Sequence, residues 1–144
     1  MIAVNRRARF DYFILNTFEC GIQLLGSEVK SIREGAVNLQ EGYAHVRNGE
    51  VFLEGVHVRP YGYAHTSPPE PTRSRKLLLH RREIDHITED LQQKRLTLVP
   101  LRMYLKKGRV KIEIGLGKGK KHHDKREAIK KQDAKRDLAR STRR

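Results

Sequence analysis

A two-residue turn inside an alternating run constrains the fold of this chain more than any other feature. Along residues 43–58, YAHVRNGEVFLEGVHV, the side chains alternate in size or in polarity on both sides of Asn48-Gly49. Asn-Gly supplies the two positive-φ residues of a type I′ turn, the connection that best matches the twist of two antiparallel strands. The segment therefore predicts a β-hairpin.

A second hairpin is predicted over LTLVPLRMYLKKGRVKIEIGLG, residues 96–117. Val110, Ile112 and Ile114 alternate with charged residues, and Lys107-Gly108 supplies the turn. Because proline cannot donate a ladder hydrogen bond, Pro100 predicts an edge strand or a bulge. Earlier in the chain, residues 9–25 are rich in aromatic and aliphatic side chains and predict two strand-length runs joined near residues 17–21.

Two short helices interrupt the predicted strands. Residues 27–35 favour a helix with Ser27 as N-cap and Gly35 as its end. Ile84, Ile87 and Leu91 stand on one face of an amphipathic helix of about three turns. Residues 77–79, three leucines, are compatible with a strand or with the entry to that helix. The proline-rich residues 62–72 predict a mobile loop.

These elements predict a mainly β domain over residues 1–117. Short antiparallel strands with small inserted helices usually close as a small barrel, and the oligonucleotide-binding fold is one such barrel. A flat sheet with a helix against one face is the main alternative.

Charge is concentrated in the remaining residues, 118–144, which form a predicted basic tail. The whole chain carries a net charge of +14, and 12 basic and 4 acidic residues in the tail supply +8 of it. A field of this sign favours polyanionic partners, and the lack of a long apolar run argues against a membrane. With Cys20 as its only cysteine, the chain has no disulfide framework, and a reduced, cytoplasmic location is expected.

No catalytic constellation stands out in the sequence. Seven histidines and one cysteine lack the spacing of a metal site, and GLGKGK at residues 115–120 matches neither common phosphate-binding loop. That glycine-rich segment is better explained as a flexible hinge between the body and the tail. We therefore expect neither an enzyme, nor a metal, nor a cofactor.

The tail has the pattern of a helix but lacks a face that could pack. Asp124 and Glu127 have capping-box spacing, and the following residues lack glycine and proline. Ile129 and Leu138 are its only sizeable apolar side chains, so an isolated helix would be marginal. The tail is expected to become helical on an anionic, grooved partner such as RNA, and a permanently solvated tail is the alternative.

Four segments together resemble one family. NRRARFDYFI, GSEVKSIREG, TRSRKLLLHRREI and GKGKKHHDKR occur in the order and spacing of the small protein B family, over about residues 5–126. The resemblance implies an oligonucleotide-binding-type barrel that holds the tRNA-like domain of transfer-messenger RNA. It also implies a role as an adaptor of trans-translation, which delivers this RNA to stalled ribosomes.

The resemblance assigns sites to both parts of the chain. It places Glu19, Leu78 and His80 in the RNA-binding cluster, with asparagine common in the family where this chain has His80. Nearby basic residues expected to assist are Arg7, Arg9, Arg75 and Lys76. The tail residues expected at the decoding centre and in the empty mRNA channel of the small subunit, some by basic helix character alone, are Lys118, Lys120, Lys121, His123, Asp124, Lys125, Arg126, Lys130, Lys131, Lys135, Arg136 and Arg140.

The resemblance also implies indirect partners, alanyl-tRNA synthetase and elongation factor Tu, reached through the RNA. Two other readings of the basic sequence stay open. A resident ribosomal protein could thread such a tail into ribosomal RNA, and a nuclease or RNA-modifying enzyme would need catalytic groups that the sequence does not display.

Overall fold

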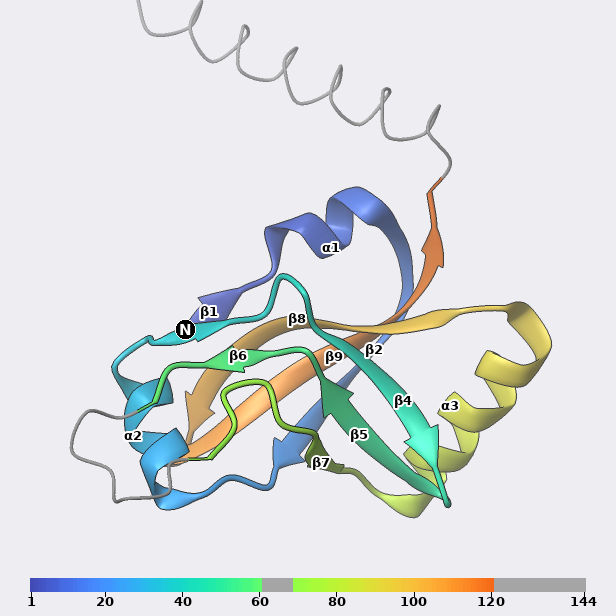
Figure 1. Ribbon diagram of the computed structural model, residues 1–144. Helices are drawn as coiled ribbons and strands as arrows, with labels where there is room; N and C mark the ends of the chain where they lie inside the picture. Colours follow the sequence, from blue (N-terminus) through green and yellow to red (C-terminus); the bar gives the residue numbers. More distant parts are fainter. Residues whose placement is uncertain (61–68, 121–144) are drawn as a thin grey trace, which may run out of the picture.

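The computed structural model describes residues 1–60 and 69–120 and shows a mainly β body with three helices around it (Figure 1). The strands are β1 (Ala3–Val4), β2 (Tyr12–Ile22), β3 (Val37–Asn38), β4 (Tyr43–Arg47), β5 (Glu50–Glu54), β6 (His57–Val58), β7 (Arg75–Leu78), β8 (Thr97–Lys106) and β9 (Arg109–Gly119). The helices are α1 (Arg6–Asp11), α2 (Gly26–Arg33) and α3 (Arg81–Lys94). The described residues contain no helix long and apolar enough to cross a membrane.

The strand pairings of the main sheet return on themselves. The order is β1-β8-β4-β5-β7-β2-β9, and β9 also pairs with β8, so six strands form a ring of antiparallel pairs. β4 joins β8 through Ala44 and Leu98, which completes the ring. The predicted mainly β class is confirmed, whereas the closed barrel of oligonucleotide-binding type stays a prediction.

Both predicted hairpins are confirmed. Asn48 and Gly49 connect β4 to β5 with φ angles of 53° and 74°, and Lys107 and Gly108 connect β8 to β9 with 51° and 76°. All four residues thus take the left-handed conformation that a type I′ turn requires. The β8–β9 register shifts between Pro100 and Arg102, so the proline marks a bulge. A bulge was one of the two outcomes predicted for Pro100.

The prediction that residues 9–25 form two strands was wrong. Residues 6–11 form helix α1, and residues 12–22 form one continuous strand rather than two. Residues 17–21 cannot turn because they pair with β9, Thr17 opposite Gly115 and Gly21 opposite Lys111. The N-cap of α1 is Asn5, whose side chain accepts a hydrogen bond from the Ala8 amide and donates to the carbonyls of Leu39 and Pro100.

The two predicted helices agree with the sequence except at one cap. The N-cap of α2 is Leu25 rather than Ser27, because the Glu28 carboxylate accepts the Leu25 amide proton at 2.8 Å and caps the first turn. Gly35 ends the helix with a φ of 79°, as predicted. α3 is confirmed, with Ile84 and Ile87 buried in the core. Of the three leucines at residues 77–79, the first two lie in a strand, because β7 ends at Leu78.

The core lies inside the ring of strands. Inward-facing side chains alternate with outward-facing ones where Val51 and Leu53 lie on β5 and Ile112 and Ile114 on β9, and Leu116 of β9 joins them; all five are at most 1% exposed. α3 closes one side of this core with Ile87.

The glycine-rich segment 115–120 is not a hinge. β9 pairs with β2 as far as Gly119 opposite Tyr12, and the Lys120 amide donates to the carbonyl of Asp11 at 2.8 Å. The segment is therefore built into the sheet. The mobile loop predicted over residues 62–72 falls mainly on 61–68, outside the described residues.

Candidate nucleic-acid interface

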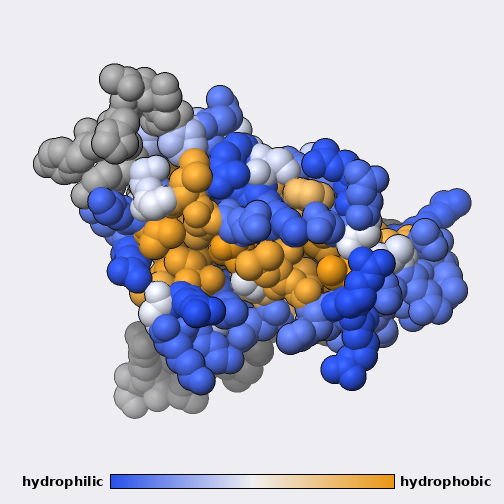
Figure 2. Space-filling model, turned by 90° about the horizontal axis from the view of Figure 1, so that it is seen from below, coloured by the Kyte–Doolittle hydropathy of each residue, from blue (hydrophilic) through white to orange (hydrophobic). Residues whose placement is uncertain are grey.

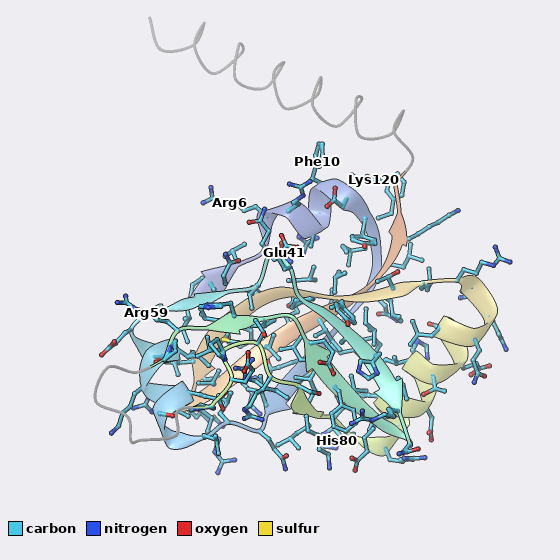
Figure 3. All side chains as sticks on the ribbon, in the orientation of Figure 1. Arg6, Phe10, Glu41, Arg59, His80 and Lys120 are labelled. Atoms are coloured by element: carbon cyan, nitrogen blue, oxygen red, sulfur yellow. The ribbon has the colours of Figure 1, made fainter. Side chains whose placement is uncertain are left out.

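Three elements bring Glu19, Leu78 and His80 together. Glu19 lies on β2, Leu78 ends β7 and His80 is the N-cap of α3. All three line one hollow of about 330 Å³, together with Gly21, Leu79, Glu83 and Lys111. His80 lies at the lower edge of the molecule in Figure 3. A surface that offers an acid, an exposed leucine and an imidazole can contact base edges, apolar base faces and ribose.

The Glu19 carboxylate is held by two donors from β8. The Tyr104 hydroxyl donates to Oε2 at 2.5 Å, and Lys106 Nζ lies 3.2 Å from Oε1 and 3.4 Å from Oε2. These hydrogen bonds, Tyr104 first and Lys106 second, lower the pKa of Glu19 below its usual range. Burial and then the bond to Glu19 raise the pKa of Tyr104 to about 12. Glu19 is therefore an ionised acceptor with a fixed direction at neutral pH.

Leu78 is presented to solvent by a glycine across the strand pair. Leu78 is 46% exposed at the end of β7. Gly21 is its cross-strand partner, and a Cβ built on Gly21 would meet Leu78 Cβ at 3.2 Å. The missing side chain leaves the leucine room to lie over β2 and to line the hollow.

The imidazole of His80 is available for a partner. Its backbone N–H donates to Glu83 Oε1 at 3.2 Å, which caps α3, but within residues 1–60 and 69–120 its ring makes no hydrogen bond. The ring can therefore donate or accept one hydrogen bond from outside.

An apolar hollow of about 300 Å³ adjoins the first one. It shares Gly21, Leu78 and Lys111 with it and adds apolar side chains from β2, α2 and β9. Its remaining lining residues are Ile22, Leu24, Val29, Gly108, Arg109 and Val110. Figure 2 shows hydrophobic surface on this lower face of the molecule, bordered by hydrophilic side chains. The combination of apolar floor and cationic edge suits a nucleotide, whose base is apolar on its faces and whose phosphate is anionic.

Arg75 does not reach this surface. Its side chain is 1% exposed and donates to Glu28 Oε2 at 2.8 Å and to the carbonyls of Val56 and Pro71. Alternation along β7 explains the placement, because Arg75 shares the inward face with Leu77. The expectation that Arg75 assists RNA binding conflicts with this geometry, which gives it a structural role. Lys76 faces outward and pairs with Glu50 at 2.8 Å.

Arg7 and Arg9 lie at the other end of the molecule. Both are exposed on α1, and Figure 3 shows the labelled α1 residues Arg6 and Phe10 at the top, far from His80. They are grouped instead with the last described residues. Lys120 Nζ donates to the Arg9 carbonyl at 3.1 Å and lies 4.9 Å from the centre of the Phe13 ring. Lys118 is exposed on β9 opposite Phe13.

The other predicted tail contacts lie outside the described residues. These are Lys121, His123, Asp124, Lys125, Arg126, Lys130, Lys131, Lys135, Arg136 and Arg140. Among residues 1–60 and 69–120, no group of three histidine, cysteine, aspartate or glutamate side chains could hold a metal ion.

Sequence reasoning missed Tyr104, Lys106 and Gly21. The alternation of β8 placed Arg102, Tyr104 and Lys106 on one face, which was a readable signal. Their contact with Glu19 was not readable, because it depends on β2 lying beside β9, about a hundred residues away in the chain.

The comparisons with known proteins agree with one another. A family model described as SmpB protein matches residues 2–144. The chain belongs to the SmpB family. The match extends through the basic tail, beyond Arg126, where the resemblance by motif ends.

Named relatives of this SmpB-family chain are similar along almost their whole length. An SsrA-binding protein of Acetivibrio thermocellus is 55% identical over 97% of this chain and 91% of its own length. One from Synechococcus elongatus is 54% identical over 100% and 94%. Among solved structures, a chain from "tmRNA-SmpB: a journey to the center of the bacterial ribosome" matches with a TM-score of 0.70 and 43% identity, over 88% of this chain and 93% of its own.

Proposed function

We propose that this protein is the RNA-binding adaptor of trans-translation, which binds the tRNA-like domain of transfer-messenger RNA and brings it to stalled ribosomes. Its SmpB-family membership, the SsrA-binding relatives and the similar chain on the bacterial ribosome support this function. It acts in the cytoplasm and as a binding protein rather than an enzyme.

One observation carries the proposed RNA site: Glu19, Leu78 and His80 come from three separate elements and meet in one hollow. The ring of strands behind them is the closed barrel of oligonucleotide-binding type in this proposal, and it presents the RNA-binding groups on one lower face. Arg75 supports β7 from inside, and Lys76 lies on the outward face of the same strand.

The basic tail is the second functional part of the proposal. The part of the tail that follows Lys120, residues 121–144, enters the vacant mRNA channel of the small ribosomal subunit and becomes helical there, with His123 at the decoding centre. A channel of RNA backbone attracts the +8 charge of the tail, and the release of counterions makes this contact weaken steeply with salt. Arg7, Arg9, Lys118 and Lys120 lie at the end of the body where the tail begins, so they act with the tail. Alanyl-tRNA synthetase and elongation factor Tu join through the bound RNA.

A binding titration tests the division of labour. The full chain and a chain ending at Lys120 are titrated with the tRNA-like domain and with an unrelated RNA of equal length, each at two salt concentrations. The cut follows Lys120 because β9 runs to Gly119 and Lys120 is bonded to α1. The shortened chain is expected to keep its preference for the tRNA-like domain at the higher salt and to lose ribosome rescue.

The opposite result has a definite meaning. If the shortened chain binds both RNAs equally, recognition does not reside in the body, and a resident ribosomal protein with a threaded tail becomes the better account. Counting copies on translating ribosomes distinguishes the two, because a resident protein occupies every ribosome.

A further inference from the structure

Glu19 is an unexpected residue at the centre of an RNA-binding surface. The chain carries a net charge of +14, and RNA is a polyanion, so a carboxylate there repels the phosphates that the rest of the protein attracts. Its neighbours nevertheless keep it charged, because the bonds from Tyr104 and Lys106 favour the ionised form. The carboxylate must therefore serve something other than phosphate binding.

The register of three strands shows how this carboxylate is aimed. Glu19 on β2 pairs with Glu113 on β9, and Glu113 pairs with Arg102 on β8, so the three side chains share the outer face. Arg102 bonds to Glu113 at 3.1 Å and neutralises it separately. Tyr104 and Lys106 follow Arg102 on the same face of β8 and reach across β9 to Glu19.

The two donors leave little of the carboxylate unused. An ionised carboxylate offers about four lone-pair sites. Tyr104 takes one on Oε2, and Lys106 lies within hydrogen-bond distance of both oxygens. About one acceptor site on the Glu19 carboxylate is left. Glu19 lines the hollow together with Leu78 and His80.

We propose that Tyr104 and Lys106 are positioning residues that orient Glu19 as an acceptor for one amino or imino N–H of a nucleobase. Phosphate oxygens carry no proton and are repelled, whereas the exocyclic amino groups of cytosine, adenine and guanine donate to a carboxylate. Glu19 therefore contributes selectivity for an exposed base edge rather than general affinity for RNA. The inference rests on the proposed function, since it assumes that Glu19 contacts the RNA.

A mutant cycle with a salt series tests the inference. Tyr104→Phe and Lys106→Met are made in the full chain, alone and in a Glu19→Gln background, and titrated with the tRNA-like domain and the unrelated RNA. Lys107→Met is the matched control, because Lys107 is exposed next to Lys106 and makes no bond to Glu19. Tyr104→Phe removes only the hydroxyl, so the ring packing is kept.

Three results are expected. Tyr104→Phe and Lys106→Met each weaken binding of the tRNA-like domain about three- to tenfold and leave binding of the unrelated RNA unchanged. Neither has a further effect in the Glu19→Gln background, because both act through that carboxylate. Lys106→Met leaves the dependence of the binding constant on salt unchanged, as a residue that does not touch phosphate must.

Other results separate the two levels of the argument. If Glu19→Gln binds as tightly as the unchanged chain, the proposed role of Glu19 fails and the positioning role fails with it. If Glu19→Gln weakens binding but Tyr104→Phe and Lys106→Met do not, only the positioning role is wrong. If Lys106→Met weakens binding of both RNAs and makes the binding constant depend less steeply on salt, Lys106 is a phosphate contact and the inference is overturned.

Discussion

Two glutamates in this protein are each held by two side-chain donors but differ in how far they are exposed. Glu28 is 2% exposed and binds Arg73 and Arg75, whereas the Glu19 side chain is 40% exposed and binds Tyr104 and Lys106. In both, hydrogen bonds hold the pKa of the carboxylate below its usual range, although burial acts against this most strongly for Glu28. The two carboxylates differ in their exposure to solvent. An enclosed ion pair can only support the fold, while an exposed one can still bind a partner.

Glu28 joins three parts of the chain. It caps α2 through the Leu25 amide, holds the first residue of β7 through Arg75 and holds the segment before β7 through Arg73. Arg75 in turn bonds the carbonyls of Val56 and Pro71. A buried pair of this kind contributes little relative to an apolar pair, but removal of one partner leaves a buried charge without compensation.

The largest expected effect is therefore on stability at Arg75. Arg75→Ala is expected to lower the free energy of unfolding by about 3–5 kcal/mol, because it removes the buried partner of the Glu28 carboxylate and leaves the carbonyls of Val56 and Pro71 without their donor. Denaturant unfolding followed by circular dichroism measures it. Arg73→Ala, at a side chain 29% exposed, is the matched control and should cost clearly less. Equal losses would mean that burial does not separate the two arginines.

Glu19→Ala should show the opposite pattern. Binding of the tRNA-like domain is expected to fall about ten- to hundredfold, in line with the loss of a specific base contact. The denaturation midpoint should stay where it is, because the side chain is on the surface. A lowered midpoint with unchanged affinity would place Glu19 in the same class as Glu28 and remove the contrast.

Acid should weaken the fold mainly through Glu28. A carboxyl group whose pKa is lowered by folding stabilises the protein above its ordinary value of 4.5, and this stability is lost as the pH falls through the lower, folded value. Unfolding free energies measured from pH 7 downward should therefore decline below about pH 4.5. Glu28→Gln should start less stable and decline less. A parallel decline in both proteins would show that other carboxylates dominate.

The smallest effect is expected at Arg102. Its pair with Glu113 lies on the surface, with the Arg102 side chain 44% exposed, so Arg102→Ala should change stability by less than about 1 kcal/mol. RNA binding should not change, because the Glu19 carboxylate keeps both donors. A tenfold loss of affinity in a filter-binding assay would show that the whole outer row of β8, and not Tyr104 and Lys106 alone, supports the site.

The local elements could be predicted from the sequence, because their signals are local. Asn48-Gly49 and Lys107-Gly108 carry their own turn chemistry, and Ile84 and Ile87 fix α3 by their spacing. α1 was missed because its start depends on Asn5, which bonds to Leu39 and Pro100, residues far along the chain. The cap of α2 was misplaced because Glu28 both caps the helix and binds Arg75. A capping rule based on serine does not anticipate this.

The candidate site divides in the same way. Family motifs named Glu19, Leu78 and His80, and the structure places them in one hollow. The same motifs did not reveal which arginine is buried, although the alternation of RKLL put Arg75 on the face of Leu77. Tyr104 and Lys106 needed the order of strands, which no periodicity contains.

That order has a consequence for synthesis of the chain. β2, near the start, finds its partner β9 at residues 109–119, so the ring of strands cannot form until almost the whole described body has left the ribosome. Non-local pairings of this kind slow folding, since the loop between the strands must close first. A chain released before β9 would have Glu19, Tyr104 and Lys106 but no strand to hold them side by side. The surface that we propose binds RNA is thus assembled late in synthesis, and if the proposal holds, incomplete copies of the protein would not compete for the RNA.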